Sequence, residues 1–71
     1  MNIQKIKELA LSLNWNIPFQ SETEMDITKG KIIICIESNG FFTAVEHTPY
    51  GNVITRSNTE DELEKIIMEN S

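Results

Sequence analysis

Three glycines at nearly regular spacing constrain the fold of this 71-residue chain more than any other feature. Gly30, Gly40 and Gly51 lie about ten residues apart, in the turn-like contexts "TKGK", "SNGF" and "TPYGN". β-Branched and aromatic residues fill the intervals between them. Turns at this spacing, separating runs of this composition, predict a meander of antiparallel strands. We expect strands over about 19–28, 31–38, 41–48 and 53–56, and whether the last one pairs stays open.

Apolar residues recur at helical spacing near both ends of the chain. The first stripe predicts a helix over about residues 3–14, which Pro18 prevents from continuing much further. Near the other end, Thr59 and Glu62 have the spacing of a capping box, which predicts a second helix over about residues 60–69.

The whole chain, 1–71, is therefore expected to be a single small α+β domain with two layers. Its element order is α-β-β-β-(β)-α, an antiparallel meander of three or four strands with both helices on one face.

Turn chemistry predicts how the strands pair. Asn39-Gly40 is the preferred pair for a two-residue type I′ hairpin, which would set Ile34 opposite Val45. Lys29-Gly30, as a second two-residue turn, would set Met25 opposite Ile34. Directly opposed residues share a face, so both turns place apolar side chains on one side. We expect this side to form the core, with Thr23, Met25, Ile27, Ile32, Ile34, Ile36, Phe41, Thr43 and Val45.

By the same parity, the reverse face gathers carboxylates around a strip of Ile33, Cys35, Phe42 and Ala44. With both helices on the core face, no element is left to cover this strip. Exposed apolar surface rimmed by polar groups often marks an interaction site. Antiparallel sheets also commonly leave one polar face in water, so simple solvation stays an alternative. The candidate partner-binding residues are Glu22, Glu24, Asp26, Ile33, Glu37, Phe42 and Glu46.

The charge balance favours one kind of partner. Eleven acidic against six basic residues give a formal net charge of −5, which repels phosphate backbones and disfavours nucleic acid. A protein partner with a basic surface is favoured, and pairing of two acidic faces would allow at most a weak homodimer of an otherwise monomeric chain. The longest apolar run, 32–36, is far shorter than the ~20 residues of a membrane span. The single cysteine and polar N-terminus are typical of a cytoplasmic protein.

Cys35 and His47 are the only residues from which a cysteine–histidine dyad could be built. The expected register places them on opposite faces, and a three-residue turn would still leave them about 13 Å apart, whereas a dyad needs about 3 Å. Glu22, Glu24 and Asp26 alternate along one predicted strand, but no loop that could wrap a calcium ion accompanies them. We therefore expect no catalytic residue, no metal and no cofactor.

Three resemblances of layout help to rank the functions. The α-β-β-β-α order resembles a double-stranded-RNA-binding domain, but "NTEDELEKII" stands where those domains carry lysines. The segment "GNVITRSNTEDELEKII" after the strands is similar to HicB-type antitoxins, although the N-terminal helix departs from that pattern. A short acidic chain that opens "MNIQKIKEL" and carries the hairpin "KIIICIESNGFF" is similar to some phage anti-CRISPR inhibitors that imitate DNA charge.

The favoured function is a non-enzymatic, acidic protein-interaction module, an inhibitor or regulator of phage or mobile-element type. Its partner would carry a basic surface, as nucleic-acid-binding proteins do. The alternative is a nucleic-acid-binding regulator of dsRBD-like or HicB-like topology that uses its turns and Arg56. Further alternatives are a small enzyme and a soluble domain with only a structural role.

Overall fold

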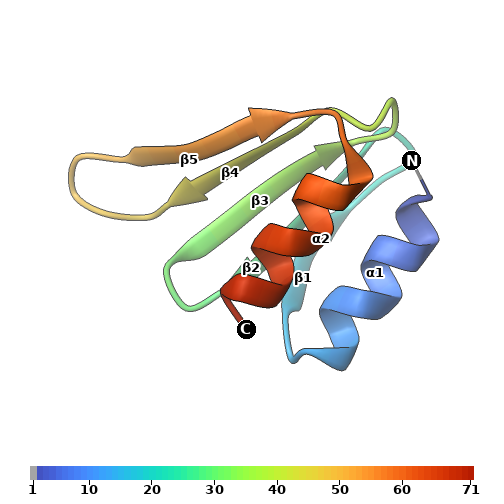
Figure 1. Ribbon diagram of the computed structural model, residues 1–71, viewed down its shortest axis with the longest axis horizontal. Helices are drawn as coiled ribbons and strands as arrows, with labels where there is room; N and C mark the ends of the chain where they lie inside the picture. The colour runs from blue at the N-terminus through green and yellow to red at the C-terminus, as the bar shows by residue number, and fades with distance from the viewer. Residues whose placement is uncertain (1) are drawn as a thin grey trace.

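The computed structural model describes residues 2–71, which form two helices packed on one face of a single antiparallel sheet (Figure 1). The strands follow one another in the order β1-β2-β3-β4-β5, so each pairs with its neighbours in the chain. The elements are α1 (Ile3–Ser12), β1 (Asn16–Gln20), β2 (Glu24–Lys29), β3 (Ile32–Glu37), β4 (Phe42–Glu46), β5 (Asn52–Ser57) and α2 (Glu60–Glu69). The expected two-layer α+β architecture is confirmed. In residues 2–71, no helix is long and apolar enough to cross a bilayer.

The sheet has one strand more than expected, because the segment 19–28 folds as a hairpin rather than as one strand. The Ser21 hydroxyl accepts the backbone N–H groups of Thr23 and Glu24, at 3.2 Å each, and so turns the chain between β1 and β2. Pro18 lies in β1, where the register is irregular between Asn16 and Phe19. Proline is tolerated there because β1 is an edge strand. At the opposite edge, the open question is answered: β5 pairs with β4.

Helix α1 begins at the expected position and ends earlier than predicted. Asn2 caps its start, because its Oδ1 accepts the N–H of Lys5 at 3.1 Å. Asn14, with φ of 66°, turns the chain out of the helix. The Lys29 ammonium reaches across from β2 and donates to the Leu13 carbonyl at 2.6 Å. A cation at this end also complements the helix dipole.

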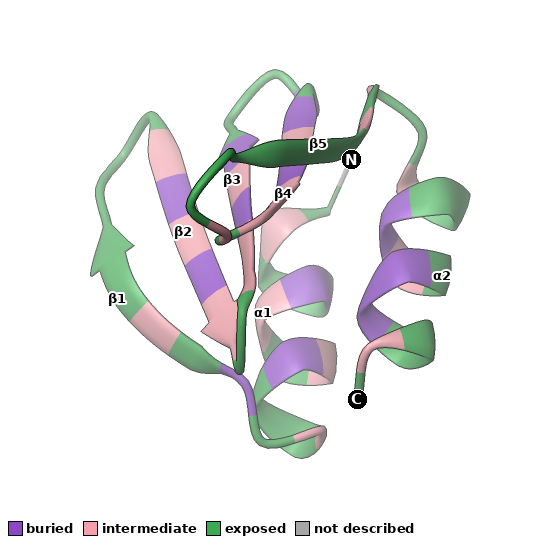
Figure 2. Cartoon of the chain, turned by 90° about the vertical axis from the view of Figure 1, so that its left-hand side faces the viewer, coloured by how far each residue is buried: buried purple, intermediate pink, exposed green. Residues whose placement is uncertain are grey.

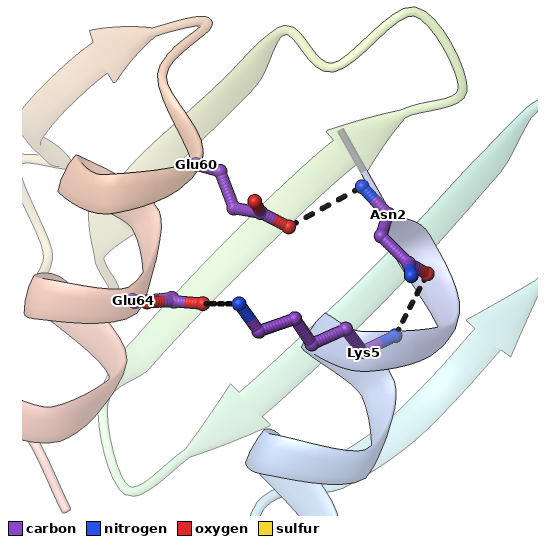
Figure 3. A network of polar contacts seen from close by, with 4 residues as sticks. All are labelled: Asn2, Lys5, Glu60 and Glu64. Atoms are coloured by element: carbon purple, nitrogen blue, oxygen red, sulfur yellow. Dashed lines mark hydrogen bonds and ion pairs between the residues drawn. The ribbon is translucent and has the colours of Figure 1, made fainter.

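The starts of the two helices are tied together, as Figure 3 shows. The Asn2 N–H donates to the Glu60 carboxylate at 3.3 Å, and the Lys5 ammonium lies 3.1 Å from the Glu64 carboxylate. Hydrogen bonding to Glu64 and its charge raise the pKa of Lys5, with smaller contributions from Glu60 and Asp61. Lys5 is exposed, so this contact orients the helices more than it stabilises the fold.

The core lies between the helices and the inner strands, as the buried bands on β2, β3, β4 and both helices show (Figure 2). β1 and β5 are largely exposed. The buried cluster contains Ile6, Ala10, Trp15, Met25, Ile27, Ile34, Ile36, Phe42, Ala44, Leu63, Ile66 and Ile67. The Trp15 indole is also satisfied, because its N–H donates to the Ser71 hydroxyl at 3.0 Å.

The predicted register between β2 and β3 is wrong by two residues, but the predicted faces are confirmed. Met25 lies opposite Ile36 and Ile27 opposite Ile34, because the turn consists of Gly30 and the following lysine. Gly30 has φ of 58°, a conformation that glycine adopts without strain. A shift of two residues preserves the alternation of side chains, so Met25, Ile27, Ile34 and Ile36 all face the helices.

The predicted register between β3 and β4 is wrong by one residue, and this error inverts β4. Ile34 lies opposite Ala44 rather than Val45. The connection is a three-residue loop, 38–40, in which Gly40 has φ of 95° and the Glu37 N–H donates to the Phe41 carbonyl at 2.8 Å. A glycine in this conformation at the end of a three-residue loop is a common hairpin closure.

Because β4 is inverted, two predicted site residues and three predicted core residues lie on the sheet face opposite to the one predicted. Phe42 is 0% exposed in the core, and Glu46, four residues further on, lies on the same helix-facing side at the end of β4. Phe41, Thr43 and Val45 instead face away from the helices. A one-residue slip exchanges the two faces of a strand completely.

The inversion predicts how stability responds to substitution in "FFTAVE". Phe42→Ala should lower the free energy of unfolding by about 3–5 kcal/mol, as much as Ile34→Ala, because both side chains are fully buried. Phe41→Ala, at a side chain that is 39% exposed, should cost less than about 1 kcal/mol. Urea denaturation followed by Trp15 fluorescence measures all three. A larger loss for Phe41→Ala than for Phe42→Ala would contradict this register.

Candidate functional site: the open sheet face

The sheet face opposite the helices, called the open face below, is covered by no element of residues 2–71 (Figure 2). Cross-strand pairs arrange its side chains in rows. One row contains Phe19, Asp26, Cys35, Thr43 and Arg56. The next contains Asn16, Thr28, Ile33, Val45 and Val53. Glu24, Glu37 and Phe41 form a third, at the end nearest the β3–β4 loop.

The structure brings four of the seven predicted site residues together on the open face: Glu24, Asp26, Ile33 and Glu37. Glu22 is exposed in the turn between β1 and β2, outside the strands of this face. Phe42 and Glu46 belong to the opposite face, as described above. The predicted apolar anchor therefore has to be replaced.

The residues that sequence reasoning missed are apolar ones. Val45 replaces Phe42 beside Ile33, and Val53 extends the same row onto β5, where it is 50% exposed. Phe41 and Phe19 are also exposed, by 39% and 48%. The two adjacent phenylalanines, 41 and 42, could have predicted an exposed ring, because neighbouring residues of a strand point to opposite faces of the sheet. The open face is thus more apolar than predicted.

One end of the open face carries three carboxylates without a neutralising cation. Glu24 lies directly opposite Glu37, and Asp26 follows two residues along β2. The ion pairs formed within residues 2–71, Lys5–Glu64 and Lys65–Glu69, are both made by the helices. Like charges directly opposite each other destabilise a sheet pair, so a cationic partner placed here would relieve repulsion.

A small cluster within this acidic end contains Glu24, Asp26 and Cys35, whose ligand atoms lie within 4.8 Å of one another. Burial raises the pKa of the Cys35 thiol from 9.0 to about 11, with further contributions from the charge and hydrogen bonding of Asp26 and from the charge of Glu24. At neutral pH the thiol is therefore protonated, and it reacts slowly as a nucleophile, because nucleophilic attack needs the thiolate.

The cysteine–histidine pair also fails on geometry. The three-residue loop places His47 on the same face as Cys35, by the alternation along β4. However, Cys35 pairs with Thr43, four residues before His47, which is about 13 Å along a strand. The open face thus presents apolar contact surface and negative charge.

Comparison with protein-family models, with curated protein sequences and with solved structures finds no significant match to this chain.

The raised pKa of the Cys35 thiol predicts that this residue is alkylated slowly. At neutral pH the thiolate fraction should be about one hundredth of that of a cysteine with a pKa of 9.0. The pH dependence of alkylation by iodoacetamide, followed by mass spectrometry, should have its midpoint near pH 11. Asp26→Asn should lower that midpoint, yet keep it above 9.0, because burial is the largest cause and Glu24 remains.

The control for this experiment is Glu8→Gln, which removes one carboxylate from the exposed surface of α1 and should leave the midpoint unchanged. An Asp26→Asn midpoint equal to that of the unaltered chain would contradict the assigned role of the Asp26 carboxylate.

Proposed function

We propose that this chain is a non-enzymatic protein-interaction module that docks a partner with a basic surface onto the open face. The observation that carries the proposal is that one face combines the apolar Ile33–Val45–Val53 row with unpaired carboxylates. Asp26 lies in the next row, and Glu24 and Glu37 lie in the row after it. Apolar surface rimmed by charge is a common composition for a docking site.

The two parts of the surface would have different tasks. Ile33 and Val45 are half-buried in the middle of the sheet, so they are held rigidly by their neighbouring strands. Rigid apolar anchors supply most of the affinity of an interface. The carboxylates lie towards one end, where they would accelerate encounter with a basic partner and set the salt dependence of association. A net charge of −5 acts in the same direction over longer distances.

The class of partner that fits best is a nucleic-acid-binding protein, whose basic surface the acidic face would occupy. In this form the chain acts as an inhibitor or regulator, as expected for a phage or mobile-element protein. Direct binding of nucleic acid is disfavoured, because Arg56 is the only basic residue in the three rows of the open face.

The first test uses affinity capture from cells that express the protein, followed by calorimetry with each purified candidate. Ile33→Thr preserves the β-branched shape and removes apolar surface, so it should weaken binding by about 1–3 kcal/mol. Leu11→Thr is the matched control, because Leu11 is 50% exposed on α1, away from the open face. If every captured protein binds Ile33→Thr as well as it binds the unaltered chain, the open face is only a solvated sheet.

A second test addresses charge. Glu37→Lys should slow association and flatten its salt dependence, with a smaller effect on dissociation. Nucleic acid should compete with the chain for the captured partner. Duplex DNA and RNA should show no submicromolar binding to the chain itself at low salt, and salt-sensitive binding of that strength would favour the nucleic-acid-binding alternative instead.

A further inference from the structure

A second surface lies on the other side of β5, in the groove between this edge strand and α2. The groove has a volume of about 210 Å³ and is lined by Ile54, Thr55, Glu62, Lys65, Ile66 and Glu69. Ile54 is 43% exposed there, although it is a large apolar residue. The residues of the open face do not contribute to this groove.

The two edges of the sheet differ in their readiness to accept another strand. The β1 edge contains Pro18 and an irregular register, both of which hinder pairing with an added strand. The β5 edge, "NVITRS", contains neither proline nor an acidic residue, but it carries Arg56 and one extra residue, Ile54, between the pairs Ala44–Thr55 and Val45–Val53. From Thr55 to Ser57 the pairing with β4 is regular, so this part of the free edge lacks both hindrances of the β1 edge.

The hydrogen-bonding direction of β5 follows from that of β4. The Glu37–Phe41 hydrogen bond shows that Phe41 directs its backbone groups towards β3. By alternation, Ala44 directs its groups towards β5, where it pairs with Thr55. The next residue, Arg56, therefore directs its N–H and C=O outward, towards the free edge. Its side chain lies beside Thr43 on the open face, away from the groove.

On the α2 side of the groove, three side chains lie in a row along the helix. Glu62, Ile66 and Glu69 have the spacing i, i+4 and i+7, so they follow one face of the helix over about 10 Å. Alternate residues of an extended strand are about 6.5 Å apart. A strand added to β5 could place basic, apolar and basic side chains near Glu62, Ile66 and Glu69. The same groove also contains Lys65, 3.9 Å from Glu69.

Charge also decides against a second copy of this chain as the occupant. Helix α2 carries five carboxylates and a single lysine, and pairing of two β5 edges would bring two such helices close together. The Lys65–Glu69 pair, at 3.9 Å between exposed side chains, neutralises only part of this charge.

We propose that the β5 edge and the α2 groove bind an extended peptide segment by strand addition, with the pattern basic-x-apolar-x-basic on the side that faces α2. The backbone of the segment pairs with the outward groups of β5, including those of Arg56. Its central apolar side chain contacts Ile54 and Ile66, and its basic residues contact Glu62 and Glu69. Backbone pairing supplies affinity in this mode, and the alternate side chains supply specificity.

The test uses a synthetic peptide, acetyl-Thr-Lys-Thr-Val-Thr-Lys-Thr-amide, titrated into the ¹⁵N-labelled full chain. We expect saturable binding with Kd at or below about 1 mM, with shifts confined to the amides of β5 and α2. The same peptide with glutamate in place of both lysines should bind at least about tenfold more weakly. Absence of saturable binding, or shifts centred on the open face, would overturn the proposal.

Two sets of controls separate strand addition from general attraction. Two peptides, one N-methylated at its odd-numbered residues and one at its even-numbered residues, test backbone pairing without altering the protein. One of the two should lose binding, because its methyl groups replace the N–H groups that would pair with β5. Binding of both peptides would overturn the proposal. Glu62→Lys should weaken binding at least about tenfold. Glu8→Lys, which makes the same change in net charge on α1, should have a smaller effect, and equal effects would also overturn the proposal.

Arg56→Pro and Arg56→Ala form a matched pair, because both remove the same side chain but only proline removes the outward N–H. Proline is tolerated on an edge strand at such a position. The proline variant should bind the peptide at least about fivefold more weakly than the alanine variant. Equal affinities would overturn the placement of the peptide on this edge, provided that the amide spectra of the two folds agree.

Discussion

The three-residue loop 38–40 is the constraint on which the rest of the structure depends. With Gly40 in a left-handed conformation, the chain returns so that Ile34 faces Ala44, and Phe42 then reaches the core. One residue fewer would exchange the two faces of β4, and β5 would follow. The composition of both surfaces of the sheet is thus decided at this one turn.

The choice of face also has a packing reason. On the helix-facing side, β4 contributes a large ring at Phe42 and a small methyl group at Ala44, both 0% exposed, in one cluster with Leu63 and Ile67. Alternation of large and small side chains lets layers interdigitate at the density of a protein interior. Hydrophobicity alone favours the other choice, since Val45 is more apolar than Ala44. The valine is instead left on the open face.

This arrangement leaves β5 between two surfaces of different character. On one side the open face combines apolar rows with unpaired carboxylates, and on the other a narrow groove runs between the free edge and α2. Both surfaces are acidic, which follows from the charge of the whole chain, but they would recognise different shapes. A sheet face offers a broad contact surface, whereas an edge and a groove suit an extended segment.

The sequence alone predicts the two helices, the glycine turns, the acidic character and the helix-facing sides of β2 and β3, because these depend on local periodicity and composition. It also placed Glu24, Asp26, Ile33 and Glu37 on the open face, since a two-residue error in register preserves alternation. Only the tertiary structure decided the face of β4, the split of the first strand and the pairing of β5. Asn-Gly marks a turn but does not count its residues, and the count is set by which side chains fit beneath the helices.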